Sequence, residues 1–525
     1  MFNRNRFLRR VAAIASISLV AGCSLLSDGS PDNKGPIIVG TTSAPSTLDP
    51  AGAYDGSWEL YRNIYQTLLA YPNGATTPQP DAAQSCSFTD STSRTYRCTL
   101  REGLKFADGA PLTAEAVQHS IDRIRTINAP SGPAGLLGSL DRIQTSGDRE
   151  IVFHLNKPDA TFPFVLATPA MSIVDPDDYP ANSLRKDNKV FGSGPYKIKS
   201  YDEGKQVTLV ANKNYKGFAK LQNDAVTIRY FQNSSSMVKA LRAKQIDVTY
   251  RGLAADDILA LQQHGSSDLE LIDGAGVDIS YLVFNPKDPW AGRPAVRKAI
   301  AQIVNRSAIA HKVYKDTVDP LYSMVPTGLT GHTTGFFDDY GNPSVPKARK
   351  ILTDAGITQP VPLTFWYTTD RYGSETALMF QELKRQLEAS GLFTITIKGR
   401  PWKTYVVGYQ KGEYPVFGRG WFPDFPDADN FIAPFVGEHN ALGTPYPSKE
   451  ITDKLLPHSR AESDRAQTVK DMEQAQQILV NDARLIPLWQ GRQYIAASED
   501  ISGGEQSLDP STIMMMWTLH RKTSW

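Results

Sequence analysis

Residues 278–304, DISYLVFNPKDPWAGRPAVRKAIAQIV, place a strand directly before a helix. The strand, 278–285, is rich in β-branched and aromatic side chains, which favour an extended chain. Pro and Gly then interrupt the pattern, and 293–304 follows with Ala and Ile at helical spacing. A strand that leads into a helix is the building unit of α/β folds.

The same alternation continues on both sides of this segment. Strands are predicted at 37–42, 94–100, 150–155, 205–211, 225–231, 245–248, 363–367, 393–397 and 486–489. Helices are predicted at 58–70 behind a Ser57 cap, from 113 onward, and at 234–243, 345–354, 374–390 and 464–482. No repeat of fixed period is present. The sequence therefore predicts α/β layers throughout.

The N-terminus indicates export. Four arginines, at positions 4, 6, 9 and 10, precede a short apolar stretch at 11–21. This stretch is far below the ~20 residues of a membrane-spanning helix, so 1–22 is predicted to be a signal peptide. It ends in LVAGC at 19–23, which resembles the bacterial lipobox, whose Cys is lipidated. The alternative is an ordinary cleaved signal with an incidental cysteine.

A lipid on Cys23 would hold the protein on the outer face of the cytoplasmic membrane. Two acyl chains suffice for stable anchoring, whereas one does not. Residues 23–36 are polar and rich in Ser, Gly, Pro and Asp, which is typical of a flexible tether.

Composition excludes some classes of function. The chain has 56 Lys and Arg against 55 Asp and Glu. Loss of the leader removes four Arg, so the mature chain has 52 basic and 55 acidic residues and a net charge of −3. Such balance gives no electrostatic basis for nucleic-acid binding. The remaining length exceeds what one core serves, so two or three subdomains are expected.

Two cysteines remain after Cys23. Cys86 and Cys98 enclose a polar segment that precedes a predicted strand. In an exported chain a disulfide across a hairpin is the expected state. A metal site is the weaker interpretation, because no nearby His or Cys completes it.

Motifs of catalysis are absent. The sequence contains no HExxH, no G-x-S-x-G and no phosphate-binding loop. Asp424, Asp427, Asp429 and Asn430 resemble a calcium loop only loosely, since the turn Gly and the distal Glu are missing. We therefore expect no enzyme activity, no cofactor and no metal, although scattered Ser, His and Asp could still converge in space.

Six segments together resemble the family 5 solute-binding proteins of ABC importers, the dipeptide and oligopeptide type. They are 47–71, 96–117, GSGPYKI at 192–198, 281–310, GWFPDFPDADNF at 420–431 and LIPLWQ at 485–490. The resemblance implies a two-lobed, class II periplasmic-binding-protein-like clamp with an extra subdomain inserted in lobe I. Lobe I would comprise 37–75, 192–284 and 490–525, the insert 76–191, and lobe II 285–489.

The resemblance also implies a site between the lobes. In relatives an Asp in the W-x-x-D segment receives the peptide ammonium, and that position is Asp424 here. The backbone at Gly420, Trp421 and Phe422 would pair with the peptide main chain. Trp402 would line a side-chain pocket. From lobe I, the loop with Tyr54, Asp55 and Gly56 would approach the ligand.

One position departs from the family pattern. Oligopeptide binders carry an Arg three residues before the W-x-x-D Trp, where this chain has Gly418 followed by Arg419. On a strand a shift of one residue points the side chain to the opposite face.

The expected function is capture of oligopeptides for an ABC permease with cytoplasmic ATPases, by a monomeric protein. The alternatives are the same fold binding a nickel chelate, an oligosaccharide or an amine metabolite, and a cell-surface enzyme or sensor.

Overall fold

The computed structural model describes residues 35–72, 74–263, 268–437 and 439–522. The predicted leader 1–22, the lipidation site Cys23 and all but the last two residues of the predicted tether lie outside the described residues. Residues Pro36–Trp525 cluster into one compact unit. Among the described residues no helix has the length and apolar character needed to span a membrane.

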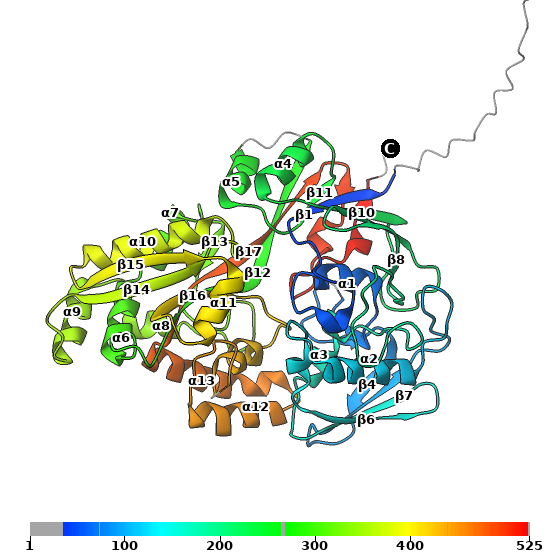
Figure 1. Cartoon of the computed structure of the whole chain (residues 1–525), viewed down its shortest axis with the longest axis horizontal. Coiled ribbons are helices and arrows are strands. Elements are labelled where there is room, and N and C mark those ends of the chain that lie inside the picture. Colours follow the sequence, from blue (N-terminus) through cyan, green and yellow to red (C-terminus); the bar gives the residue numbers. More distant parts are fainter. Residues whose placement is uncertain (1–34, 73, 264–267, 438, 523–525) are drawn as a thin grey trace, which may run out of the picture. The chain divides into compact units, whose positions relative to one another are not determined.

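A large mixed sheet forms the centre of this unit (Figure 1). In the described chain it has eleven strands in the order β15-β14-β16-β12-β17-β11-β1-β10-β9-β8, with β13 paired to β17. The strands are β1 (Ile37–Thr41), β8 (Tyr196–Asp202), β9 (Gln206–Ala211), β10 (Ala225–Tyr230), β11 (Val248–Thr249), β12 (Leu269–Phe284), β13 (Val318–Pro320), β14 (Val361–Thr368), β15 (Phe393–Arg400), β16 (Val416–Trp421) and β17 (Leu485–Ser498).

A second sheet has the order β4-β5-β7-β6. It consists of β4 (Ala83–Phe88), β5 (Thr95–Leu100), β6 (Leu140–Ser146) and β7 (Glu150–Leu155). Two short pairs join β2 (Leu69–Ala70) to β3 (Gln79–Pro80) and β18 (Ile501–Ser502) to β19 (His520–Arg521).

The helices cover these sheets. They are α1 (Trp58–Ile64), α2 (Ala114–Ile127), α3 (Phe162–Leu166), α4 (Ser234–Arg242), α5 (Ala255–Gln263), α6 (Pro294–Ile303), α7 (Arg306–Lys312), α8 (Gly335–Tyr340), α9 (Val345–Asp354), α10 (Glu375–Ala389), α11 (Trp402–Gln410), α12 (Leu456–Ala461) and α13 (Val469–Asp482).

Two long strands connect the two lobes of the fold. β12 and β17 pair with each other along most of their length, and Figure 1 shows them running side by side through the centre. β17 pairs with β11 in lobe I, whereas β12 pairs with β16 in lobe II. Their register shifts between Ala275 and Ile279, where the regular pairing is interrupted. The chain therefore passes between the two lobes within two continuous strands, β12 and β17.

Hydrophobic cores mark the lobes. One core joins β1, β9 and β10 to the second sheet and α2, so the segment predicted as an insert shares its core with lobe I. Two further cores fill lobe II on the two faces of its sheet. Leu282 and Phe284 of β12 already pack in one of these lobe II cores. The exact domain boundaries drawn from the sequence stay predictions.

One predicted helix is wrong in length. The pattern predicts 58–70, but α1 ends at Ile64. The Ile64 carbonyl accepts a hydrogen bond from the Gly194 amide at 3.1 Å. Farther on, the Leu68 carbonyl accepts from the Asp81 and Ala83 amides at 3.0 and 3.1 Å. These partners come from distant parts of the chain, and they satisfy the backbone that a longer helix would have used.

Cys86 and Cys98 lie opposite each other on β4 and β5 and form a disulfide. Replacing both by alanine is expected to lower the free energy of unfolding by about 3 kcal/mol, because the cross-link restricts the unfolded chain. Urea unfolding of the oxidised protein, the reduced protein and the double variant measures this. The reduced protein is the matched control, and a loss below about 1 kcal/mol in both would contradict the expectation.

Candidate functional site

Asp424 lies in the loop that follows β16, with 5% of the residue exposed. Its Oδ2 accepts a hydrogen bond from Asn430 Nδ2 at 2.8 Å, and its own amide donates to Asn430 Oδ1 at 2.9 Å. This reciprocal pair fixes the carboxylate in one orientation. Burial raises the pKa of Asp424 to about 6, against the lowering effect of its hydrogen bonds. The result is a desolvated carboxylate that is still ionised at neutral pH.

Tyr54 reaches Asp424 from the other lobe. Its hydroxyl donates to Asp424 Oδ1, although the two residues are 370 positions apart. The Tyr54 ring packs edge-on against Trp58, with 5.3 Å between centroids. Burial and the Asp424 carboxylate raise the pKa of Tyr54 well above its usual value, so the hydroxyl stays a donor. The predicted residues from the two lobes thus meet at one carboxylate.

The loop around Tyr54 is built for a close approach. Asp55 Oδ1 accepts from the Ser57 amide at 2.8 Å, and Trp58 Nε1 donates to the Ala53 carbonyl at 3.2 Å. A Cβ on Gly56 would lie 2.3 Å from Ser43 Oγ, so a side chain there would displace its neighbour. Asp55 and Gly56 therefore shape the loop that presents Tyr54.

Aromatic side chains line the lobe II side of the site. Trp402 opens α11, and its ring lies 5.8 Å from that of Tyr372, which in turn lies 6.4 Å from Phe422. Phe422 is 42% exposed. The exposed Arg371 lies 5.4 Å from the Trp402 centroid. This aromatic wall offers flat apolar surface beside a cation.

Within the described residues, the edge of β16 near Gly420 has no strand neighbour on the β14 side, and two tyrosine hydroxyls cover it: Tyr405 donates to the Gly418 carbonyl at 2.8 Å and Tyr372 to the Gly420 carbonyl at 3.4 Å. β14 pairs with β16 only at Val416 and Phe417, so in the described chain 418–421 has a strand neighbour on the β12 side alone. The Trp421 ring does not face this edge. It is buried against Phe435, at 5.0 Å and nearly perpendicular, and Nε1 donates to Asn430 Oδ1 at 3.2 Å. The Trp421 side chain is therefore part of a lobe II core.

Gly418 and Arg419 occupy opposite faces of β16. A Cβ on Gly418 would lie 2.6 Å from the Phe380 ring, so Phe380 leaves no room for a side chain at this position. Arg419 is buried on the other face, 5.5 Å from the Trp402 centroid and 4.7 Å from that of Tyr409. Its Nη1 donates to the Ala441 carbonyl at 3.2 Å. Arg419 therefore supports the aromatic wall from within the lobe.

A partly buried ion pair lies beside the loop of Tyr54, and sequence reasoning missed it. Arg251 Nε lies 2.7 Å from Glu59 Oε1, and the Arg251 guanidinium lies 5.7 Å from the Phe422 centroid. Burial raises the pKa of Glu59 to about 7, opposed mainly by Arg251. Asp278, on β12, is half-buried nearby, and desolvation raises its pKa as well. Nothing in the sequence pattern distinguishes these three from ordinary surface charges.

The acidic run after Asp424 is not a calcium loop. Asp427 pairs with Arg465 at 2.8 Å, and Asp429 pairs with Arg460 at 2.7 Å. Two arginines thus neutralise these carboxylates and hold the loop. Among the described residues, one group has the spacing of a cation site, formed by Asp108, Asp175 and Asp178, and none of its members contacts the site described above.

Other contacts also join the two lobes. The Ala255 amide donates to Glu375 Oε1 at 3.0 Å, at the start of α5 and α10. The Ala160 amide donates to the Arg460 carbonyl at 2.7 Å. Phe425 packs against Phe164 at 5.9 Å. The lobes are therefore in contact at several points besides Asp424.

Comparison with known proteins gives a family match over most of the chain. Residues 77–443 match the model of the bacterial extracellular solute-binding proteins, family 5. The probable D,D-dipeptide-binding periplasmic protein DdpA of Escherichia coli is 28% identical over 490 residues, which cover 90% of this chain and 91% of that protein.

Solved structures share the fold. DppA from Helicobacter pylori, in complex with the peptide STSA, has a TM-score of 0.78 at 23% identity and covers 93% of this chain and 98% of its own. AgaA from Agrobacterium tumefaciens, in complex with agropinic acid, has a TM-score of 0.75 at 21% identity, with 94% and 99% covered. The two-lobed clamp predicted from the sequence is confirmed.

Proposed function

This chain belongs to family 5 of the bacterial extracellular solute-binding proteins, and we propose that it captures peptides with a free amino terminus for an ABC importer. The observation that carries the proposal is the desolvated Asp424 carboxylate at the contact between the lobes. Burying an ammonium is costly unless a fixed carboxylate receives it. Asp424 provides that carboxylate, and Asn430 keeps it oriented.

The rest of a peptide has matching surfaces. The edge of β16 near Gly420 would pair with the peptide main chain, as an added strand does, with the peptide taking the place of the Tyr372 hydroxyl at the Gly420 carbonyl. Trp402, Tyr372 and Phe422 offer apolar surface that tolerates different side chains. The exposed Arg371 beside Trp402 is the cation best placed for a carboxylate, because Arg419 is buried inside the lobe.

The proposal includes the route to the permease. The solute would bind between the lobes, shift the protein toward its closed form and be delivered to permease subunits with cytoplasmic ATPases. Lipidation of Cys23 would keep the protein on the outer face of the cytoplasmic membrane. Several curated relatives are named as dipeptide-binding or di/tripeptide-binding proteins, which supports peptides as the solute class.

A non-peptide amine is the second candidate. The AgaA structure contains agropinic acid, so the same fold accommodates a solute that is not a peptide. In this chain Phe380 fills the face of β16 at Gly418, where oligopeptide binders carry a cation in the pattern described above. A solute with an ammonium and no peptide carboxylate would satisfy Asp424 equally well.

Binding of a dipeptide is expected to weaken in acid. The pKa of Asp424 is about 6 in the unliganded protein, and an ammonium favours the ionised carboxylate. Because the pKa is raised, the carboxylate is ionised and the affinity for the dipeptide is at its maximum above pH 7. The affinity falls as the pH drops through 6, by about tenfold between pH 7 and pH 5. Calorimetry at pH 5, 6 and 7 with Ala–Ala and N-acetyl-Ala–Ala tests the proposal.

The acetylated dipeptide has no ammonium and serves as the control, together with Asp424→Asn. Binding of the acetylated dipeptide to the wild-type protein and binding of Ala–Ala to Asp424→Asn should both lack the pH dependence. A dependence that persists in Asp424→Asn would point to Glu59, whose pKa is about 7, and equal affinity for both dipeptides would reject ammonium recognition.

A further inference from the structure

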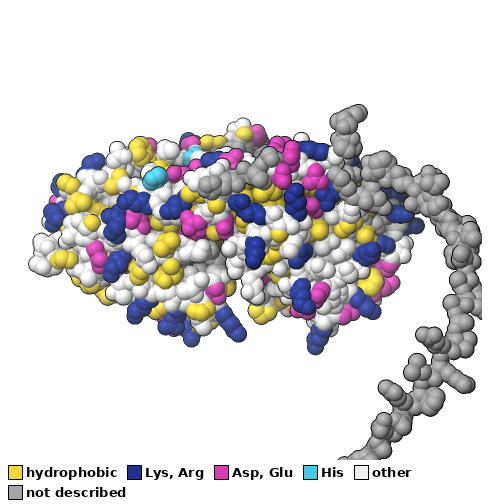
Figure 2. Space-filling model, turned by 90° about the horizontal axis from the view of Figure 1, so that it is seen from above, with side chains coloured by type: hydrophobic (Ala, Val, Ile, Leu, Met, Phe, Trp, Pro, Cys, Tyr) yellow, Lys and Arg dark blue, Asp and Glu magenta, His cyan; other side chains and the backbone are white. Residues whose placement is uncertain are grey.

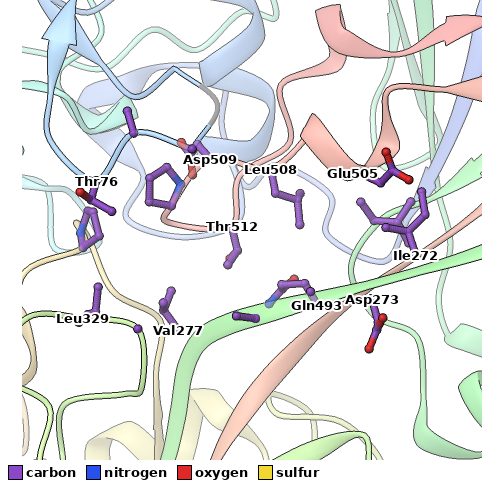
Figure 3. A pocket seen from close by; sticks show the side chains of 18 of the residues that line it. Thr76, Ile272, Asp273, Val277, Leu329, Gln493, Glu505, Leu508, Asp509 and Thr512 are labelled. Carbon is purple, nitrogen blue, oxygen red and sulfur yellow. The ribbon is translucent and has the colours of Figure 1, made fainter.

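A cavity of about 380 Å³ lies between β12, β17 and the C-terminal segment (Figure 3). Both lobes form its walls. Lobe I contributes Gly74, Ala75, Gly504, Glu505, Leu508–Pro510 and Thr512, and the start of the predicted insert contributes Thr76, whereas Thr327–Leu329 and Pro426 come from lobe II. Its volume lies near the lower end of the range of about 300 to 1,000 Å³ that is usual for small-molecule sites. The space is thus sized for a small solute or for part of a larger one.

The cavity is close to the Asp424 carboxylate. Pro426, which lines it, is two residues beyond Asp424 in the same loop. Thr512 lines it from the other lobe, and Arg251 Nη2 donates to the Thr512 carbonyl and hydroxyl at 3.0 and 3.2 Å. The cavity therefore adjoins the loop that carries Asp424 and the segment that Arg251 holds.

The walls of the cavity are largely apolar. Ile272, Val277, Leu329 and Leu508 surround it in Figure 3, and Ile495 of β17 also lines it. Transfer of an apolar group into such a space gains about 25 cal/mol for each Å² removed from water. The lining therefore favours an aliphatic or aromatic group.

The charges of the cavity all have one sign. Asp273, Glu505 and Asp509 line it, and the described lining residues include no Lys, Arg or His. Asp509 pairs with Arg62 at 3.4 Å and accepts from the Ser511 and Ile513 amides. Asp273 pairs with Arg492. An acidic group that entered would lose its hydration and find no cation to replace it.

We propose that this cavity receives one side chain of the captured peptide and that it selects apolar side chains against acidic ones. The inference rests on the proposed function, because it takes Asp424 as the partner of the ammonium. It adds a preference for apolar over acidic side chains, which recognition of the ammonium alone does not give.

Gly274 offers a direct way to fill the cavity. It lines the space, a Cβ built on it meets no atom within 4 Å, and its backbone is not left-handed. Gly274→Leu should therefore fold normally and occupy part of the volume. Gly135→Leu is the matched control, since its Cβ also has open space and it does not line the cavity.

The test uses three dipeptides, Ala–Ala, Leu–Leu and Glu–Glu. Within each dipeptide the two side chains are the same, so it does not matter which of them enters the cavity. Calorimetry on the mature protein is expected to show Leu–Leu binding at least tenfold more tightly than Glu–Glu. Gly274→Leu should weaken Leu–Leu at least tenfold and Ala–Ala by less than threefold, whereas Gly135→Leu should change neither. Glu505→Lys should strengthen Glu–Glu at least threefold.

The outcomes separate the two proposals. If dipeptides bind and depend on Asp424, but Gly274→Leu leaves Leu–Leu affinity within twofold, only the cavity assignment is overturned. Equal affinity for Leu–Leu and Glu–Glu, unchanged by Glu505→Lys, overturns the charge selection. If the wild-type protein binds none of the three, the proposed function and the cavity assignment fall together.

Discussion

Replacing Asp424 by alanine is expected to weaken dipeptide binding by about 2–5 kcal/mol, because the solute's ammonium would be buried without its partner. The loss should exceed that for an exposed ion pair, since the carboxylate is desolvated and its pKa is raised to about 6. Acetylating the dipeptide removes the other half of the pair and should cause a comparable loss.

A cycle of the two changes isolates the interaction. In Asp424→Ala the acetylated and free dipeptides should bind nearly equally, because the second change removes a partner that is already gone. Calorimetry with Ala–Ala and N-acetyl-Ala–Ala on both proteins measures this. If either change alone leaves affinity within a factor of three, or if the two losses are additive, Asp424 does not receive the ammonium.

The second large effect concerns stability. Arg123 of α2 forms a fully buried, two-pronged ion pair with Asp49, at 2.7 and 2.8 Å. Asp49 precedes the loop of Tyr54, and its Oδ1 also accepts from the Ala51 amide at 3.0 Å. Arg123→Met is expected to lower the free energy of unfolding by about 3–5 kcal/mol, because it leaves a buried carboxylate unpaired.

Urea unfolding at pH 7 measures this loss, and two variants control it. Lys350→Met removes an exposed partner of Asp354 and should cost less than about 1 kcal/mol. Adding Asp49→Asn to Arg123→Met should recover part of the stability, since the buried charge is then removed as well. A cost for Arg123→Met no larger than that of the exposed control would show that the pair does not hold this part of lobe I.

The sequence predicts the elements best where local pattern and packing agree. The helix at 345–354 and the strand at 150–155 have the predicted bounds, because periodicity and flanking turn residues point the same way. β12 is much longer than its predicted part, 278–285. Gly274 and Gly276 interrupt the apolar pattern there, while pairing with β17 keeps the chain extended.

Long-range contacts account for what the sequence could not predict at the site. Tyr54 and Asp424 could be named separately from the resemblance, whereas their direct contact depends on how the lobes pack. Asn430 orients Asp424, yet the sequence suggested only a loose calcium loop there. Tyr372 and Arg251 carry no local signal, since their roles arise from partners on other elements.

The charge balance of the sequence matches the surface. Figure 2 shows Lys and Arg side chains interspersed with Asp and Glu on the face that it presents. Selectivity for a charged solute must therefore come from local groups such as Asp424 and not from the overall field of the protein.

Native mass spectrometry of the protein, purified from its own host without denaturation, tests peptide capture most directly. We predict a series of adducts that fragment as short peptides with free amino termini, and their loss in Asp424→Ala. A single adduct of non-peptide mass, retained by Asp424→Ala, would contradict both the solute class and the role of Asp424.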